Sequence, residues 1–453
     1  MQAQPTAVVP RGIVVGVGLG LTAAYVLAFV LLMNRTDYDT WGAAAIVPIL
    51  LVVTLPALAK QAERENDRRL FWLLCLALAV KLAATLIRYY VVFDVYGGRA
   101  DARGYDGGGT KIAESFLQGD FSTQLEDFSG TNFIVLLTGV FYTLTRPTLL
   151  GGFFVFSWLA FVGMFLFYRA FVMAVPEGRS RTYARLLFFL PSMLFWPGSI
   201  GKEAFMVFAL GVAAFGVAHV VTGRTVKGLV LVVLSLWPAA VVRPHIAGML
   251  AIALVVAFLI QPMRNRDRPL AVVFRGLTLV VLVAVSIFLV RETQQFLRAE
   301  SIAEALSQTS DQTGKGGSEF TPVNFFTPLG APIATFTVLY RPTLADAHNV
   351  QAVLAGLEGS FLLLFTLFRW RWVVAAFRSL RRQPYVAFAV AYVGMLVIGL
   401  SSFANFALLA RERVQLLPLF FVLLSIPPRP REAPDAVPPR PERVLVATRS
   451  GSG

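Results

Sequence analysis

Apolar runs long enough to cross a bilayer recur along most of this 453-residue chain. A helix needs about 20 apolar residues to span the hydrocarbon core of a membrane. Together with a content of 57% hydrophobic and only 15% charged residues, these runs predict an all-α, polytopic membrane protein. Twelve segments qualify as transmembrane helices: 13–33, 42–59, 70–93, 150–174, 186–200, 203–221, 228–242, 246–262, 271–290, 351–368, 384–403 and 414–426. The shorter apolar piece 132–145 predicts a re-entrant or interfacial segment.

Basic connections alternate along this series of spans. With the N-terminus in the cytoplasm, every second connection is short and rich in Lys and Arg, as the positive-inside rule requires. These connections are 60–69, 176–185, 222–227, 264–268 and 369–383. The rule therefore places both termini in the cytoplasm. It places the two longest polar segments, 94–131 and 291–350, as larger extracytoplasmic loops.

The chain divides into a transmembrane domain, residues 1–427, and a C-terminal tail, residues 428–453. The tail is rich in Pro and charged residues, which cannot bury an apolar core, so we expect a disordered cytoplasmic segment. In the second outer loop, the apolar spacing of 291–308 predicts an amphipathic helix lying on the membrane surface.

Composition also excludes several classes of partner. The net charge of +14 suggests nucleic acid in a soluble protein, but in a membrane protein Lys and Arg set orientation, so no nucleic-acid partner is expected. The single cysteine, Cys75, excludes an intrachain disulfide and a cysteine-based metal site. The three histidines lack the spacing of a zinc motif, so no protein-bound metal is predicted.

Polar side chains gather at the predicted outward ends of the spans. They lie within the glycine-rich string "GGRADARGYDGGG", which we expect to form a flexible polar loop, and within the sequences "LPSMLFWPGSIGKEAF", "VVRPHIAG", "LYRPTLAD" and "NFALLARERV". Because these ends share one face of the membrane, we expect the following side chains to approach one another: Asp101, Tyr105, Asp106, Lys202, Glu203, Arg243, His245, Arg341, Asp346, Asn405, Arg411 and Arg413.

The depth of Arg243 supports a recess at this face. Only 16 residues separate Lys227, at the cytoplasmic surface, from Arg243. A helix of that length covers about 24 Å, short of the roughly 30 Å of hydrocarbon. An arginine at such depth must line a hydrated cavity or meet an anion. Pro191, Pro197 and Pro238 near the same ends favour broken helices, which membranes tolerate where backbone lines a cavity.

A cavity of this kind suits a phosphorylated lipid. The guanidinium group of arginine can form bidentate hydrogen bonds to a phosphate or pyrophosphate. The apolar surroundings suit an acyl or isoprenoid chain. A neighbouring carboxylate can act as general base on an acceptor hydroxyl. A lipid-phosphate-linked sugar is therefore the donor that these residue types favour.

Each group also has a structural interpretation. The two aspartates can solvate a glycine-rich turn, and His245 can pack at a helix start. Lys202 and Glu203 can form an ion pair at the membrane edge, and Arg411 and Arg413 can anchor a helix at the interface. The functional interpretation is favoured because all these clusters fall on the same predicted side.

Four motifs resemble bacterial envelope-glycan enzymes. They are Asp-x-x-x-Tyr at Asp101 and Tyr105, "LPSMLFWPGSIGKEAF", "RPH" and "NFALLARERVQLLPLF", and the resemblance extends over residues 70–426. The family comprises GT-C-type glycosyltransferases that use polyprenyl-phosphate sugars, with the related O-antigen and exopolysaccharide polymerases. It implies a multi-pass protein of the bacterial inner membrane with an extracytoplasmic site and a glycan or lipid-linked acceptor.

The resemblance assigns roles to the candidate residues. Asp101 or Asp106 is implied as the catalytic base, with a phosphate clamp formed by Lys202, Arg243, Arg411 and Arg413. The remaining candidates are implied in substrate binding: Tyr105, Glu203, His245, Arg341, Asp346 and Asn405. Participation of a divalent cation, Mg²⁺ or Mn²⁺, is left open.

One feature departs from the family pattern. The key acid of GT-C enzymes usually follows the first span, whereas Asp101 follows the third. Either two helices precede the family core, or the acid lies in "NRTDYDTWG", which contains Asp37 and Asp39. We favour the first because 94–131 is the longer loop. A polymerase, a flippase or transporter of lipid-linked glycans, and a scaffold without chemistry remain the alternatives.

Overall fold

The computed structural model describes residues 11–98, 100–123, 125–260, 318–347 and 350–428, with parts of 276–314. Apart from one isolated bridge between Glu319 and Asn405, the described residues form helices and connections without strands. The elements are α1 (Arg11–Arg35), α2 (Tyr38–Arg64), α3 (Arg68–Tyr90) with its π-helical end η1 (Val91–Val95), α4 (Asp101–Leu117), α5 (Gly130–Thr145), α6 (Leu149–Ala174), α7 (Ser180–Phe189), α8 (Pro191–Phe195), α9 (Lys202–Val221), α10 (Thr225–Val242), α11 (Pro244–Ile260), α14 (Gly330–Tyr340), the 3-10 turn η2 (Leu344–Asp346), α15 (Val350–Phe368), α16 (Trp370–Ser379), α17 (Pro384–Leu400), α18 (Phe406–Arg413) and α19 (Leu417–Leu423).

The all-helical membrane class is confirmed, but the twelve crossings are not. In the described part, five helices are long and apolar enough to span a bilayer, or six if the bent pair α15–α16 is one span. The apolar helices α5, α11, α14 and α17 are shorter. The predicted span 186–200 is wrong as a single helix, because α7 ends at Phe189 and α8 ends at Phe195. The span 271–290 lies largely outside the described residues, as do the predicted surface helix 291–308 and the tail from 429.

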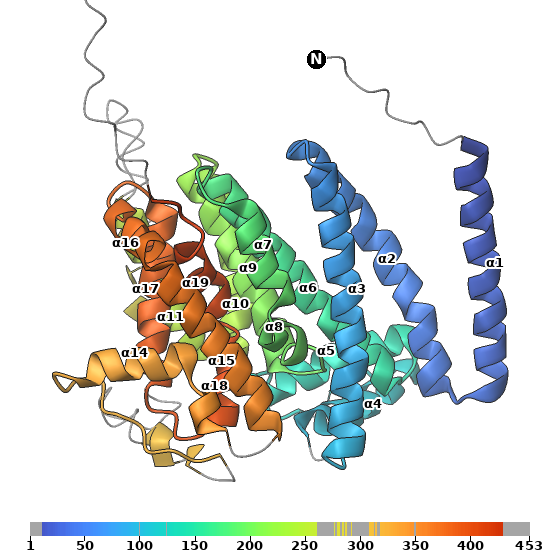
Figure 1. Cartoon of the computed structure of the whole chain (residues 1–453). Helices are drawn as coiled ribbons and strands as arrows, with labels where there is room; N and C mark the ends of the chain where they lie inside the picture. The colour runs from blue at the N-terminus through green and yellow to red at the C-terminus, as the bar shows by residue number, and fades with distance from the viewer. Residues whose placement is uncertain are drawn as a thin grey trace, which may run out of the picture.

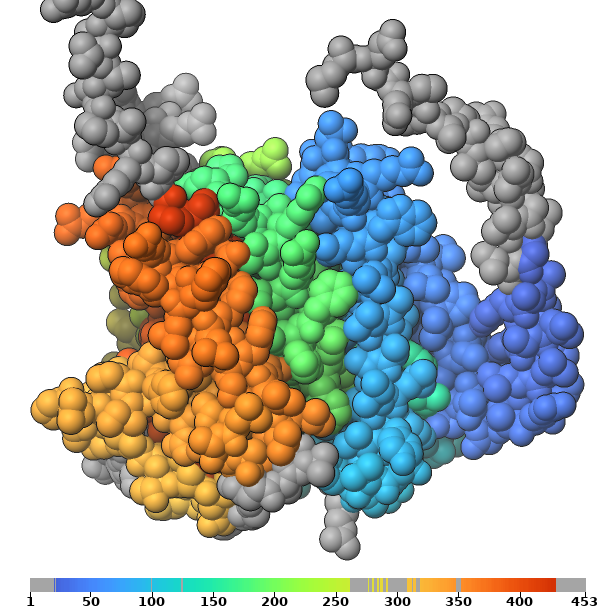
Figure 2. All heavy atoms as spheres, viewed as in Figure 1, coloured from blue at the N-terminus to red at the C-terminus, as the bar shows by residue number. Residues whose placement is uncertain are grey.

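Apolar side chains cover the lateral surface of the bundle. Val52 on α2, Trp72 on α3 and Trp237 on α10 are 72%, 63% and 68% exposed. In water such a surface would be unfavourable, whereas a lipid environment accommodates it. The helix α1 lies at the edge of the molecule beside α2 (Figure 2).

Basic connections meet at one end of the bundle. Arg181, the second residue of α7, pairs with Asp67, the residue before α3, at 2.7 Å. The guanidinium of Arg369, between α15 and α16, donates to the Leu424 carbonyl oxygen at 3.1 Å. Figure 1 shows the α2–α3 turn and α16 at this end, and α4, α14 and α18 at the other. The predicted grouping of these connections at one end agrees with this arrangement.

The glycine-rich string is helical rather than a flexible loop. From Asp101 onward it forms the first turns of α4, which packs against α5. A Cβ added at Gly109 would lie 2.7 Å from Thr138 Cγ2, and one at Gly139 would lie 2.6 Å from Ile112 Cγ2. The glycines therefore allow two helices to approach closely, which is how small residues act in membrane proteins. The prediction of a flexible loop is wrong for this reason.

A break between α7 and α9 positions the start of α9. Leu190 is extended before Pro191, and α8 is only one short turn. The buried ammonium of Lys81 donates to the carbonyl oxygens of Met193, Leu194 and Pro197 at 3.0, 2.9 and 3.1 Å. These bonds supply partners for carbonyl groups that a broken helix leaves unpaired inside the bundle. The prolines thus interrupt this helix as the sequence predicted.

Candidate functional site

Five charged side chains from four elements form one network. Arg243 donates to Glu203 Oε1 at 2.7 Å and also pairs with Glu412. Arg411 forms an ion pair with Glu203, with Nε 2.8 Å from Oε1, and donates from Nη2 to Asp101 Oδ2 at 2.8 Å. Glu203 therefore bridges two arginines, and Asp101 extends the network to α4. The sequence predicted that Asp101, Glu203, Arg243 and Arg411 approach one another, and they do.

Each member of the network lies at the end of a helix. Asp101 is the first residue of α4 and Glu203 the second of α9, where the helix dipole favours negative charge. Arg243 lies between α10 and α11, because Pro244 begins a new helix. Arg411 lies in the last turn of α18, where positive charge is favoured. These ends converge at the end of the bundle occupied by α4 and α18 (Figure 1).

Burial differs across the network. The side chains of Glu203 and Arg243 are 5% and 10% exposed, whereas Asp101 is 59% exposed. Only Asp101 Oδ2 is hydrogen-bonded; within the described chain no hydrogen bond reaches Oδ1. The network is thus closed on its inner side and presents one accessible carboxylate oxygen on its outer side.

Two further cations face this network without a carboxylate partner. Lys202 interacts electrostatically with Arg243, Glu203 and Asp101, but in the part of the chain that the structure describes its ammonium has no hydrogen bond or ion pair. The Arg88 guanidinium lies 4.5 Å from the ring centroid of Phe195, and its buried Nε has no hydrogen-bond partner. Four cations therefore face three carboxylates, so the site carries excess positive charge and suits an anion.

Asp106 belongs to a different cluster. It accepts a hydrogen bond from the Tyr142 hydroxyl at 2.6 Å, and none of the arginines of the network contacts it among the described interactions. Burial raises the pKa of Asp106, against the opposing effect of this hydrogen bond. The carboxylate of Asp39 acts on it electrostatically. Asp106 thus does not share the position of Asp101, although both were predicted as candidate bases.

The alternative acids have structural partners. Asp37 caps α2 through the Thr40 backbone N–H at 3.3 Å. Asp39 accepts from the Leu150 backbone N–H at 3.0 Å and from the Thr148 hydroxyl at 3.2 Å, at the start of α6. Neither is joined to the arginine network in the described contacts.

Arg413 is separated from Arg411 although only Glu412 lies between them on α18. Its guanidinium is 1% exposed and donates to the carbonyl oxygens of Leu339 at 3.2 Å and Arg341 at 3.0 Å. It also lies 3.8 Å from Glu358. Arg413 thus contacts different groups from Arg411, because a helix turns about 200° over two residues and directs the two side chains apart.

The remaining predicted residues divide into two groups. Arg341 and Asp346 form a local pair at 2.5 Å, and hydrogen bonding from Arg341 lowers the pKa of Asp346 to about 2. Asn405 caps α18 by accepting from the Ala407 backbone N–H at 2.9 Å. The structure brings none of these three into the network. They support the fold beside it, which differs from the substrate-binding role expected from the sequence.

Tyr105 and His245 lie next to the network. Tyr105 is buried on α4, and burial together with the charges of Asp101 and Glu203 raises the pKa of its hydroxyl to about 12. His245, the second residue of α11, experiences the positive charges of Arg243 and Lys202. Both therefore line the region in which an anion would be held.

Sequence reasoning missed two members of the site. Glu412 lies between two arginines that were singled out, so an acid inside a basic cluster was the available signal. Arg88 was not among the candidate residues; its guanidinium packs on Phe195 and Trp196, at 4.5 and 5.2 Å from the ring centroids. The aromatic pair "FW" before Pro197 was the signal for this contact.

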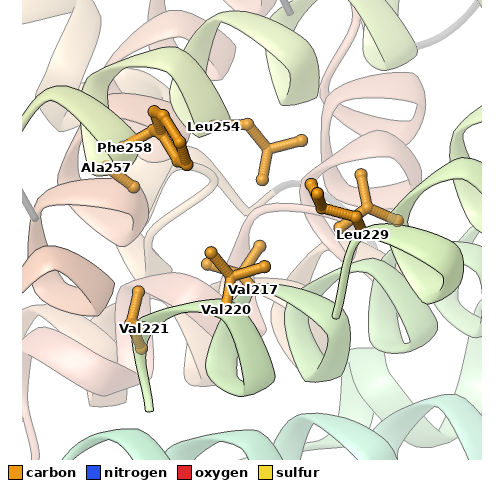
Figure 3. A pocket seen from close by; sticks show the side chains of 8 residues that line it. Val217, Val220, Val221, Leu229, Leu254, Ala257 and Phe258 are labelled. Atoms are coloured by element: carbon orange, nitrogen blue, oxygen red, sulfur yellow. The ribbon is translucent and has the colours of Figure 1, made fainter. Parts of the chain in front are cut away.

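No cluster of metal ligands accompanies the network. Among the described residues, no group of three or more His, Cys, Asp or Glu side chains is arranged to hold a metal ion. A small cavity of about 20 Å³ between α9, α10 and α11 is lined only by apolar side chains, among them Val217, Leu254 and Phe258 (Figure 3). It offers no polar group for chemistry.

Comparison of the chain with protein-family models, curated proteins and solved structures found no match.

Proposed function

We propose that this protein is a membrane-embedded glycosyltransferase that transfers a sugar from a polyprenyl-phosphate-linked donor to a glycan or lipid-linked acceptor. The observation that supports this function is that one charged network has beside it a cation without an ion-pair partner in the described structure, Lys202, and includes an exposed carboxylate, Asp101. An anion and a hydroxyl nucleophile can be held side by side at such a site.

The transfer would follow an inverting displacement. Asp101 Oδ1 accepts the proton of the acceptor hydroxyl, and the hydroxyl oxygen bonds to the anomeric carbon of the sugar. The bond from that carbon to the phosphate oxygen breaks, and polyprenyl phosphate leaves with the electron pair. The ammonium of Lys202, supported by Arg88 and Arg243, stabilises the negative charge that develops on the phosphate.

The site would face outward from a bacterial inner membrane. The described basic connections gather at the opposite end of the bundle, and such connections remain in the cytoplasm. A donor carried on a membrane lipid can be reached at that face, whereas a cytoplasmic nucleotide sugar cannot.

The test is turnover by the purified protein in lipid nanodiscs. Polyprenyl-phosphate and polyprenyl-pyrophosphate sugars are supplied with a panel of glycan acceptors, and release of the lipid phosphate is measured. Asp101→Asn should lower kcat by roughly 10²- to 10⁴-fold, the usual contribution of a general base. Asp106→Asn should have a smaller effect, because Asp106 is bonded to Tyr142 instead of the network.

A matched control is Asp120→Asn, which removes an exposed carboxylate that follows α4. It should leave kcat within about twofold of the wild type, since surface substitutions are usually near neutral. Equal turnover of wild type and Asp101→Asn would contradict the assignment of the base. Movement of intact lipid-linked glycan across the bilayer without release of lipid phosphate would favour a flippase, and turnover confined to pyrophosphate donors carrying oligosaccharides would favour a polymerase.

A further inference from the structure

A lateral apolar groove runs between α5 and α10. It has a volume of about 280 Å³ and is lined by Phe128, which precedes α5, by Phe133 and Leu136 of α5, and by Trp237 and Val241 of α10. No polar side chain lines it. The groove can therefore bind an apolar ligand but provides no hydrogen-bonding partner for it.

One end of the groove adjoins the unpartnered cation of the charged network. The ammonium of Lys202 lies 3.7 Å from where a Cβ would stand at Gly130, the first residue of α5. Phe133, one turn further along α5, packs edge-on against Phe205 of α9, with ring centroids 5.3 Å apart. Val241 precedes Arg243 by two residues. The apolar groove and the ammonium of Lys202 therefore lie next to each other at the start of α5.

The other side of the groove is open. Trp237 and Phe128 are 68% and 53% exposed, so in a membrane they would meet lipid. From Trp237 to Val241 the groove extends along one turn of α10, roughly 6 Å. This length suits the first part of a long chain, while the remainder of that chain stays in the bilayer.

We infer that this groove holds the phosphate-proximal isoprene units of a polyprenyl phosphate whose phosphate is bound by Lys202. The inference rests on the proposed function and adds the path of the lipid. Charge complementarity selects a phosphate-headed chain, because the ammonium of Lys202 lies beside the first residue of α5 and has no hydrogen-bond or ion-pair partner in the described structure. Three aromatic rings select the branched, unsaturated isoprenoid, whose methyl groups and double bonds pack on ring faces and edges.

The decisive experiment measures binding rather than turnover. The full chain in nanodiscs of zwitterionic lipid is titrated with sugar-free polyprenyl phosphate, and Kd is determined by native mass spectrometry. Leu136→Trp fills the groove and should raise Kd roughly tenfold, because the apolar area that the chain buries there is lost. Leu144→Trp makes the same change on α5 at a residue that is 83% exposed outside the groove, and should leave Kd within about twofold.

A second pair of variants removes bulk instead of adding it. Trp237→Ala takes away one aromatic wall and should raise Kd several-fold, whereas Trp72→Ala removes an exposed tryptophan on α3 and should not. This pair decides the question if Leu136→Trp fails to fold, which size-exclusion chromatography would reveal.

Two further ligands, inorganic phosphate and dodecyl phosphate, separate the possible outcomes. Inorganic phosphate should bind wild type and Leu136→Trp equally, because the groove does not contact the head group. Dodecyl phosphate should bind more weakly than polyprenyl phosphate; equal affinity for the two would overturn the isoprenoid as occupant. If both groove variants keep the wild-type Kd for polyprenyl phosphate while Lys202→Gln raises it, the isoprenoid chain must lie outside the groove. Binding as inferred without sugar transfer to any acceptor would contradict the proposed function and leave the groove assignment intact.

Discussion

At the scale of single residues, Glu203 is the group on which the charged network depends. Its two oxygens accept from both Arg243 and Arg411, and its side chain is 5% exposed. Two guanidinium groups can share this buried position only because a carboxylate lies between them. Removal of a single charge from such a group leaves the others uncompensated.

We therefore expect Glu203→Gln to lower the free energy of unfolding by about 3–5 kcal/mol, the usual cost of breaking a buried ion pair. SDS-induced unfolding in mixed micelles measures this change. The matched control is Asp67→Asn, which neutralises a carboxylate paired with the exposed Arg181. Its effect should be much smaller, because solvent screens that pair and asparagine caps a helix as well as aspartate. Equal effects of the two substitutions would show that the network does not stabilise the fold.

At the scale of elements, the contact between α4 and α5 decides where Asp101 lies. The two helices approach through glycines at positions where any side chain would collide with its neighbour. Gly109 faces Thr138 in this way, whereas Gly104 on the same helix has no atom within 4 Å of an added Cβ. The glycines of α4 are therefore not equivalent, and only some of them set the helix position.

Identical substitutions at these two glycines should have opposite effects. Gly109→Ala should destabilise the protein by about 1–3 kcal/mol through overpacking and should lower turnover, because α4 would move Asp101 away from Arg411. Gly104→Ala should stabilise it by about 0.5–1 kcal/mol, since alanine favours the helix. Unfolding and turnover are measured on both variants. A neutral Gly109→Ala would show that the close approach of α4 and α5 is not required.

At the scale of the whole molecule, the basic connections and the charged network occupy opposite ends of the bundle. Arg181 pairs with Asp67 at one end, and Arg411 pairs with Asp101 at the other. Spans that alternate in direction between the two ends produce this separation. A bilayer around the apolar lateral surface would place the two ends in different compartments.

Cysteine labelling tests this orientation. In a Cys75→Ala background, Asp120→Cys, in the exposed segment that follows α4, should react with an impermeant maleimide added to intact cells. Arg181→Cys should react only after the cells are opened, because basic connections stay inside. Reaction of both positions from the same side would contradict the spanning arrangement, and the reverse pattern would place the network in the cytoplasm.

The sequence predicted the approach of Asp101, Glu203, Arg243 and Arg411 because charge alternation assigns their segments to one end of the bundle. It could not separate Arg411 from Arg413, since only the packing of α18 determines which arginine faces the network. Nor could it separate Asp101 from Asp106, because the glycines between and beyond them suggested a loop. The helix phase of α4, set by its contact with α5, is a tertiary property.

The sequence by itself determined that this chain is helical and belongs in a membrane, because hydrophobicity and its period act locally along the chain. It also determined which ends carry charge. Only the tertiary structure decided which charges pair, that Lys202 and Arg88 have no carboxylate partner among the described residues, and that an apolar groove lies beside Lys202. Pairing and burial depend on distances between elements far apart in the sequence, and these distances are set when the helices pack.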